Sequence, residues 1–130
     1  SYNSDALKVE QVTIDAGNEI SMVEDPTTAS GYSHAVVTSR HPSISANPEC
    51  SLVATRDTYG DWIGHTEAAF DLQLDGASTS TLDIDAPKAQ IVNSQESERE
   101  RRVTDEIEWR CQKNGATANQ SVTVTFNEAA

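Results

Sequence analysis

Hydrophobic and polar residues alternate most regularly in the middle of the chain. Phe70, Leu72 and Leu74 are separated by single polar residues, and beyond a Gly-Ala-Ser segment the alternation resumes at Leu82 and Ile84. Side chains along a β-strand point to opposite faces in turn, so each run predicts a strand with one apolar and one polar face. The turn-forming residues between the runs predict that the two strands form a hairpin.

Two further alternating runs lie towards the C-terminus. They cover residues 103–111 and 122–126, and the Asn-Gly pair between them is typical of a turn. A short strand is expected at residues 89–92, after a bend at Pro87. The charged residues 96–102 predict a solvated, flexible hairpin end.

The first half of the chain is less regular. Its pattern predicts strands at residues 7–15, 34–39 and 50–56, and loops at residues 26–31 and 42–48. Asp57 is a suitable N-cap residue, so residues 57–64 are expected to form a short helix, even though Gly60 and Gly64 weaken its propensity. No linker or internal repeat divides the chain. Residues 1–130 are therefore predicted to form a single all-β domain, mainly antiparallel, with one short α-helix.

Composition adds that the core of this domain is small. The chain has 130 residues, of which 36% are hydrophobic and 5% aromatic. Such a domain can gain part of its stability from neighbouring subunits in an assembly. Because the chain begins at Ser1 rather than Met, we expect either a processed product or part of a longer chain.

The net charge of −12 excludes binding to nucleic acid by neutralisation of phosphates. Such a chain should repel DNA and anionic membranes. Solubility and adaptation to a salty habitat together explain the charge about as well as a functional acidic surface does. No apolar run is long enough to cross a bilayer, and no signal peptide is visible.

The sequence offers little catalytic chemistry. His34, His41 and His65 are not at metal-ligand spacings, and no nucleophile, phosphate-binding or dinucleotide-binding motif is present. We therefore predict no catalytic residues, no metal site and no cofactor. Cys50 and Cys111 lie in strand-like patterns, so buried thiols are favoured over a disulfide.

Four aspartates, Asp71, Asp75, Asp83 and Asp85, would share one face of the predicted hairpin. Like charges on paired strands repel each other and destabilise a sheet. Three explanations stay open: a calcium site, a solvated face, or a surface kept negative because something anionic passes along it.

From about residue 36 to residue 126, the order of several short motifs resembles the tail-tube proteins of long-tailed bacteriophages (siphoviruses). The stretches that carry the resemblance are Arg40-His41-Pro42, Leu52-Val53-Ala54-Thr55-Arg56-Asp57, Asp61-Trp62-Ile63-Gly64, Ala86-Pro87-Lys88-Ala89-Gln90-Ile91 and, at the end, Trp109, Asn114-Gly115 and Val122-Thr123-Val124-Thr125-Phe126. Residues 1–35 match no part of this pattern.

This resemblance implies a β-sandwich or partly closed barrel with one short helix near residues 57–64. It also implies hexameric rings that stack into a tube in the phage tail, assembled in the host cytoplasm, with an acidic inner wall along which DNA passes without specific binding. The type VI secretion tube shares this fold. Partners would be copies of the chain and other tail proteins, with no membrane involved and no enzymatic activity.

The resemblance also assigns roles to residues. The contact with adjacent rings would be made by Gln95, Glu96, Glu98, Arg99, Glu100, Arg101 and Arg102. The aspartates Asp71, Asp75, Asp83 and Asp85 would line either the lumen or a subunit interface.

Other functions remain open at this stage. A tail terminator or baseplate protein would have the same fold, because fold alone does not decide function. A β-sandwich that binds carbohydrate or protein could use Tyr32, Tyr59 and Trp62 as exposed anchors, although the core is the more common place for such rings. A hydrolase has the least support and would need two converging carboxylates in a pocket.

Overall fold

The computed structural model describes residues 1–75, 81–115 and 120–127. The elements in this part of the chain are β1 (Val12–Asp15), β2 (Asn18–Glu24), β3 (Tyr32–Arg40), β4 (Ser43–Ala46), α1 (Thr58–Ile63), β5 (Glu67–Asp75), β6 (Thr81–Arg99), β7 (Arg102–Cys111) and β8 (Thr123–Asn127). All strand pairs are antiparallel. The predicted class, all-β with one short α-helix, is confirmed.

The strands form two sheets that are not closed into a barrel. The larger sheet has the order β1-β4-β7-β6-β5, with β8 also paired to β6, and the smaller one contains β2 and β3 alone. Strand β6 joins two parts of the larger sheet, because its first residues pair with β5 and β8 and its later residues pair with β7. The register shifts at Pro87, as expected for a residue without a backbone N–H.

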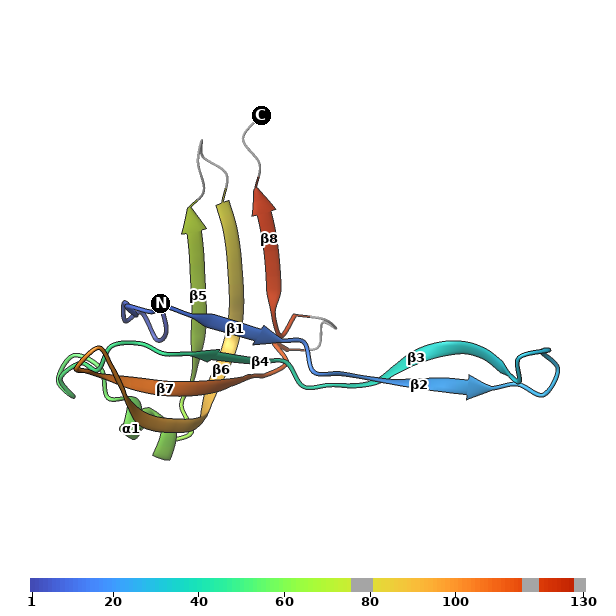
Figure 1. Ribbon diagram of the computed structural model, residues 1–130, viewed down its shortest axis with the longest axis horizontal. Helices are drawn as coiled ribbons and strands as arrows, with labels where there is room; N and C mark the ends of the chain where they lie inside the picture. Colours follow the sequence, from blue (N-terminus) through green and yellow to red (C-terminus); the bar gives the residue numbers. More distant parts are fainter. Residues whose placement is uncertain (76–80, 116–119, 128–130) are drawn as a thin grey trace.

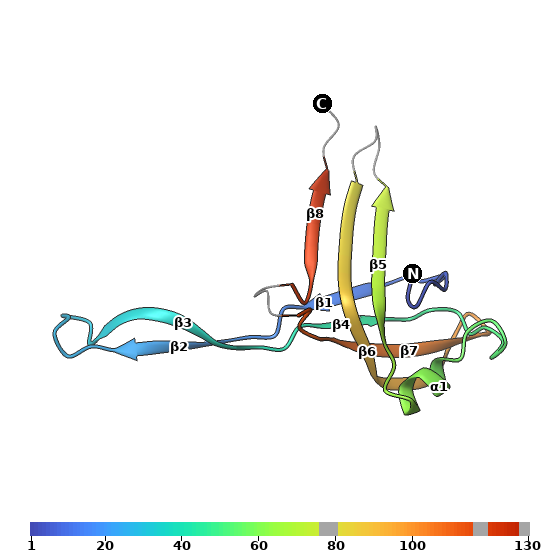
Figure 2. The ribbon, with the colours of Figure 1, turned by 180° about the vertical axis from the view of Figure 1, so that it is seen from behind.

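The molecule has three parts, which Figures 1 and 2 show from opposite sides. We call β5, β8 and residues 81–86 of β6 the blade, which stands upright in Figure 1. The body contains β1, β4, β7, the rest of β6 and α1. Residues 18–40, which include β2 and β3, form an arm that extends away from both.

The hydrophobic core lies where the blade meets the body. Trp109 of β7 is fully buried at its centre, with its ring 5.2 Å from that of Phe70 in β5 and 5.6 Å from that of Tyr2. Ile44 of β4 and Ile91 of β6 complete this cluster with smaller side chains. The predicted sandwich therefore takes the form of one bent sheet whose two parts cover a common core.

The N-terminal segment closes this core. Tyr2 pairs with Phe70 as an isolated bridge, and the backbone N–H of Asn3 donates to the carbonyl of Ala69 at 3.1 Å. Leu7 and Val9 pack against the same cluster. The predicted strand over residues 7–15 is correct only from Val12 onwards, but the residues before it contribute to the core.

Two predictions in the first half are wrong, and both concern short apolar runs. The expected loop at residues 42–48 contains β4, because Ile44 and Ala46 alternate into the core. The expected strand at residues 50–56 is a loop that turns at Leu52, whose carbonyl accepts from the N–H groups of Thr55 and Arg56. This loop surrounds the buried Arg56 side chain, so a polar group rather than apolar alternation determines its path.

The predicted helix near residues 57–64 is confirmed as α1. The side chain of Asp57 caps it by accepting from the N–H of Gly60 at 2.8 Å. Trp62 on this helix packs against the core and donates from Nε1 to the carbonyl of Val92 at 3.2 Å. The helix therefore attaches to β6 through one aromatic side chain.

Candidate functional site

The acidic face predicted from the sequence lies on one side of the blade. Asp71 and Asp85 are direct cross-strand partners, while Asp83 lies opposite Gln73 and Asp75 lies opposite Thr81. Strand β8 pairs with the other edge of β6. It places three neutral residues beside the aspartates: Thr123, Thr125 and Asn127. The four aspartates thus share one surface, as predicted, with only one directly opposed acid pair.

Asp83 is the least exposed of these aspartates. Its Oδ2 accepts from Asn127 Nδ2 at 2.9 Å, and its Oδ1 is buried without a partner among the described residues. The described residues contain no group of three or more His, Cys, Asp or Glu that could hold a metal ion. Of the three explanations for this face, the calcium site therefore has no support in the described geometry.

The opposite face of the blade is apolar and is ordered in three rows. The innermost row, with Phe70 and Ala86, is buried in the core. Farther out, the register aligns two rows of three residues, Leu72 with Ile84 and Val124, then Leu74 with Leu82 and Phe126. Exposure increases outwards, and Phe126 in the last row is 78% exposed. The apolar face therefore begins as core and ends as an uncovered surface.

The arm has a second uncovered apolar surface. Ile20 pairs with Val37, and Met22 pairs with Ala35, so these four side chains share one face of the hairpin. All four are exposed, and Ile20 reaches 67%. An isolated two-stranded hairpin is at best marginally stable in water.

The arm is the feature that sequence reasoning missed. It expected a strand near residues 34–39, which is confirmed as β3, but it expected no strand after Gly17. The signal was present, because Ile20 and Met22 alternate with Glu19 and Ser21.

The charged residues 95–102 form the end of the β6–β7 hairpin rather than a flexible loop. Both strands continue to a two-residue turn in which Glu100 and Arg101 have φ of 49° and 65°. Such positive values are typical of the tight turns that join paired strands. Residues outside the turn keep strand pairing up to Arg99 with Arg102.

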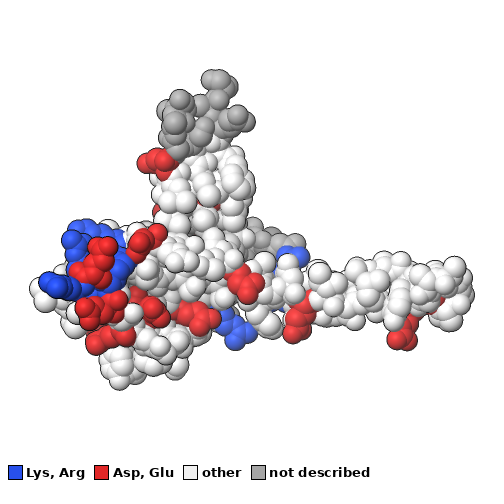
Figure 3. Space-filling model, viewed as in Figure 1, with Lys and Arg blue, Asp and Glu red and all other residues white. Residues whose placement is uncertain are grey.

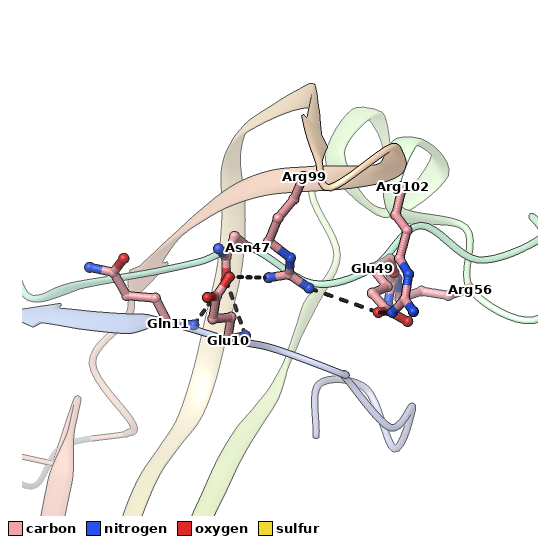
Figure 4. A network of polar contacts seen from close by, with 7 residues as sticks. All are labelled: Glu10, Gln11, Asn47, Glu49, Arg56, Arg99 and Arg102. Carbon is pink, nitrogen blue, oxygen red and sulfur yellow. Dashed lines mark hydrogen bonds and ion pairs between the residues drawn. The ribbon is translucent and has the colours of Figure 1, made fainter.

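Part of this hairpin end is tied to its own chain (Figure 4). Arg99 contacts Glu10 at 2.9 Å and Glu49 at 3.8 Å, and Arg102 contacts Glu49 at 2.8 Å. The side chain of Asn47 accepts from the backbone of the same N-terminal segment. The exposed residues left for an external partner are Gln95, Glu96, Glu98, Glu100 and Arg101.

A buried ion pair lies below this network. The Arg56 side chain is 5% exposed and reaches Asp105 at 3.1 Å, the carbonyl of Glu49 at 2.9 Å and Thr58 Oγ1 at 3.1 Å. The Cys50 thiol donates to the other oxygen of Asp105 at 2.8 Å. Partial desolvation of the thiol and the Asp105 carboxylate raise the pKa of Cys50 to about 11. These contacts fix the loop between β4 and α1 against β7.

Cys50 and Cys111 are both free thiols. Cys111 is buried as predicted, and burial raises its pKa to about 11. Cys50 is exposed, because it lies in a loop rather than in the predicted strand.

Figure 3 shows how charge is distributed on one face of the molecule. Basic and acidic side chains gather together at the left end, whereas most of the arm and much of the blade show uncharged surface. On the body, an open groove of about 330 Å³ has polar walls that include Gln11, Asn47, Asn93, Glu106 and Glu108.

The exposed aromatic side chains do not form one binding face. Tyr32 is the first residue of β3, on the arm, and Tyr59 lies on α1 at the other end of the molecule (Figure 1). Both are exposed, so the core position expected for them is wrong, whereas Trp62 is packed against the core as expected. The flat aromatic surface that would favour a carbohydrate-binding module is thus absent from these three residues.

Comparison with models of known protein families gave no match, and comparisons with curated proteins and with solved structures gave none either. Within the described residues, no helix has the length and apolar character needed to cross a membrane.

Proposed function

We propose that this chain is a structural subunit that assembles with copies of itself, and that the assembly is the tail tube of a long-tailed bacteriophage. Self-assembly is supported mainly by the solvent-accessible surface area of the chain. A single chain exposes 8764 Å². A compact monomer of 14.1 kDa is expected to expose about 6,700 Å². The excess, about 2,000 Å², is comparable to the area that a stable protein interface buries.

The location of the excess surface supports assembly rather than catalysis. The arm projects from the body, and its apolar face has no cover within the described chain. Exposed apolar patches of this kind are typical of protein–protein contacts. A subunit that completes its hydrophobic surfaces only in an oligomer also accounts for the small core.

The tail tube is the assembly that accounts best for the acidic face. Asp71, Asp75 and Asp85 are exposed on one side of the blade, opposite the apolar side. In a ring whose apolar faces are buried between subunits, this side remains in contact with solvent. If it faces the axis, the negative wall repels DNA and keeps it from adhering. Six copies to a ring, and stacking through Glu96, Glu98, Glu100 and Arg101 of the hairpin end, follow from the resemblance of the motifs.

Electron microscopy of the purified chain tests this function. We expect six-fold rings, and stacks of rings at high protein concentration, with a central channel. Asp71→Asn combined with Asp85→Asn should leave the rings intact while increasing their retention of double-stranded DNA at low salt. Glu106→Gln combined with Glu108→Gln, on β7 of the body, is the matched control, because it also removes two exposed negative charges outside the blade. Monomers at every concentration, including after addition of a tail extract, would refute the proposal. Single rings that never stack would favour a tail terminator instead.

A further inference from the structure

Among the described residues, two exposed apolar surfaces lie on different parts of the molecule. One is the arm face with Ile20, Met22 and Val37, and the other is the outer part of the blade with Val124 and Phe126. The arm points away from the blade in both views, and its strands form a sheet separate from that of the blade (Figures 1 and 2). Within the described residues, the chain therefore does not fold its arm back onto the blade.

We propose that the apolar face of the arm of one copy docks on the apolar face of the blade of a second copy. This inference rests on the proposed self-assembly and adds which surfaces meet. The two outer rows of the blade receive the arm, and their most exposed members are Leu74, Val124 and Phe126.

The apolar face of the blade continues into a groove that can receive part of a docked arm. An open groove of about 320 Å³ lies beside β8, where Ile14, Pro42, Val122 and Val124 provide apolar walls, and Asn18, Arg40 and Ser121 provide polar ones. Val124 belongs both to this groove and to the apolar face of the blade. The groove and the apolar face are therefore contiguous at Val124.

The negative charge of the arm favours docking on the apolar side of the blade rather than on its aspartate face. The arm carries Glu19, Glu24 and Asp25, so an approach to the aspartate face would place like charges together. The apolar side has no acidic residue in its three rows. An acidic arm thus has one side of the blade on which it can dock without repulsion.

The excess surface area of the chain favours a second copy of the chain as the partner of these apolar surfaces. In an arm-to-blade assembly each chain donates one arm and receives one, so it takes part in two interfaces. Two interfaces of about 800 Å² per partner require about 1,600 Å² from each chain. The excess of about 2,000 Å² over a compact monomer covers this requirement. Repeated head to tail, this contact produces rings or filaments, whereas reciprocal exchange of arms between two copies would produce a closed two-fold dimer.

The experiment uses three full-length variants and sedimentation velocity over a range of concentrations. Ile20→Asp changes the arm, Phe126→Asp changes the blade, and Leu52→Asp adds the same charge at a site that is 79% exposed and outside both surfaces. We expect the first two variants to associate at least tenfold more weakly than wild type and the third to be unchanged. At a concentration at which all four proteins are monomeric, circular dichroism should be the same for wild type and the three variants, since the altered side chains are exposed.

Mixing the two weakened variants gives the decisive measurement. The Ile20→Asp chain keeps an intact blade and the Phe126→Asp chain keeps an intact arm, so an equimolar mixture should form dimers that stop there. Assembly of Phe126→Asp alone would overturn the inference in favour of arm–arm pairing, and assembly of Ile20→Asp alone would overturn it in favour of blade–blade pairing. In both cases the proposed self-assembly stands. A wild-type chain that never associates would overturn both.

Discussion

Tyr2 is the residue through which the N-terminal segment closes the core. Its ring is 2% exposed and packs against Trp109, while its hydroxyl donates to the carbonyl of Thr66 at 3.2 Å. Burial, with a smaller contribution from the nearby Asp61 carboxylate, raises the pKa of Tyr2 to about 12. The folded chain therefore keeps the phenolic proton at pH values where the unfolded chain loses it.

This difference predicts a loss of stability at high pH. Because the folded pKa exceeds the ordinary value of 10.0, the stabilisation is complete below pH 10 and falls as pH rises towards 12. At pH 11 the loss from Tyr2 should be about 1.4 kcal/mol. Tyr2→Phe should remove this loss, while Cys111, which also titrates in this range, contributes equally to both proteins.

Urea unfolding at pH 8 and pH 11 measures the effect. Between pH 8 and pH 11, the unfolding free energy of wild type should fall by more than that of Tyr2→Phe. Tyr59→Phe, at an exposed tyrosine, is the control and should show no such change. Parallel pH profiles for wild type and Tyr2→Phe would contradict the assigned environment of Tyr2.

The buried pair of Arg56 and Asp105 gives a second prediction at this scale. Asp105→Asn leaves the guanidinium buried without a counter-charge, which should reduce the free energy of unfolding by about 3 kcal/mol or more. In the double variant with Arg56→Met the loss should be less than the sum of the single losses, because the two side chains interact directly.

The exposed pair of Lys88 and Glu67, with 3.5 Å between the charged atoms, is the comparison. Glu67→Gln should cost less than about 1 kcal/mol, since water screens exposed ion pairs. Equal costs for Asp105→Asn and Glu67→Gln in urea unfolding would show that burial does not strengthen the inner pair.

Among the elements, the blade was the most predictable from sequence. Residues 70–75 and 82–86 alternate strictly, and that alternation is the physical consequence of one face being buried and the other solvated. The structure pairs these runs in the expected hairpin and adds β8 beside them. The four aspartates were found for the same reason, because period-two patterns place them on a single face.

Elements determined by tertiary contacts were not predictable in this way. Strand β4 has only four residues and is recognisable only once Ile44 is seen beside Trp109, its partner on β7, in the core. The loop around Arg56 looked like a strand because Leu52 and Val53 are apolar, yet both are exposed. The arm is a different case, since Ile20 and Met22 alternate with Glu19 and Ser21 and this alternation is sufficient to predict β2.

The arm should be separable from the rest of the fold. Glu19 and Ser39 are paired partners at its root, so Asn-Gly in place of residues 20–38 would close a tight two-residue turn. We expect the shortened chain to keep the thermal unfolding midpoint of the wild-type monomer within a few degrees, because the core lies elsewhere. We also expect it to remain monomeric.

Differential scanning fluorimetry with light scattering measures both properties. As a control, Asn-Gly-Asn-Gly in place of residues 26–31, the turn at the arm's end, should leave association intact because both arm strands remain. A shortened chain that unfolds would mean that the arm supports the body. One that still assembles would mean that the contacts lie outside the arm.

At the scale of the whole molecule, two forces oppose each other. Apolar arm and blade surfaces favour association, whereas a net charge of −12 on every copy opposes it. The balance depends on ionic strength, because salt screens the repulsion but does not weaken apolar contacts. The Debye length falls from about 10 Å at 0.1 M salt to about 3 Å at 1 M.

Salt should therefore strengthen assembly. We expect the dissociation constant of the wild-type chain to fall several-fold between 0.05 M and 1 M NaCl, as measured by sedimentation velocity. An assembly held mainly by the ion pairs of the charged hairpin end would respond in the opposite direction, since screening weakens attraction between exposed charges. Arg101→Gln separates the two cases further, because Arg101 is exposed in the hairpin turn and belongs to neither apolar surface. If association depends on the arm and the blade, this variant should follow the wild-type salt profile; a collapse of association at low salt would instead assign the main contact to the hairpin end.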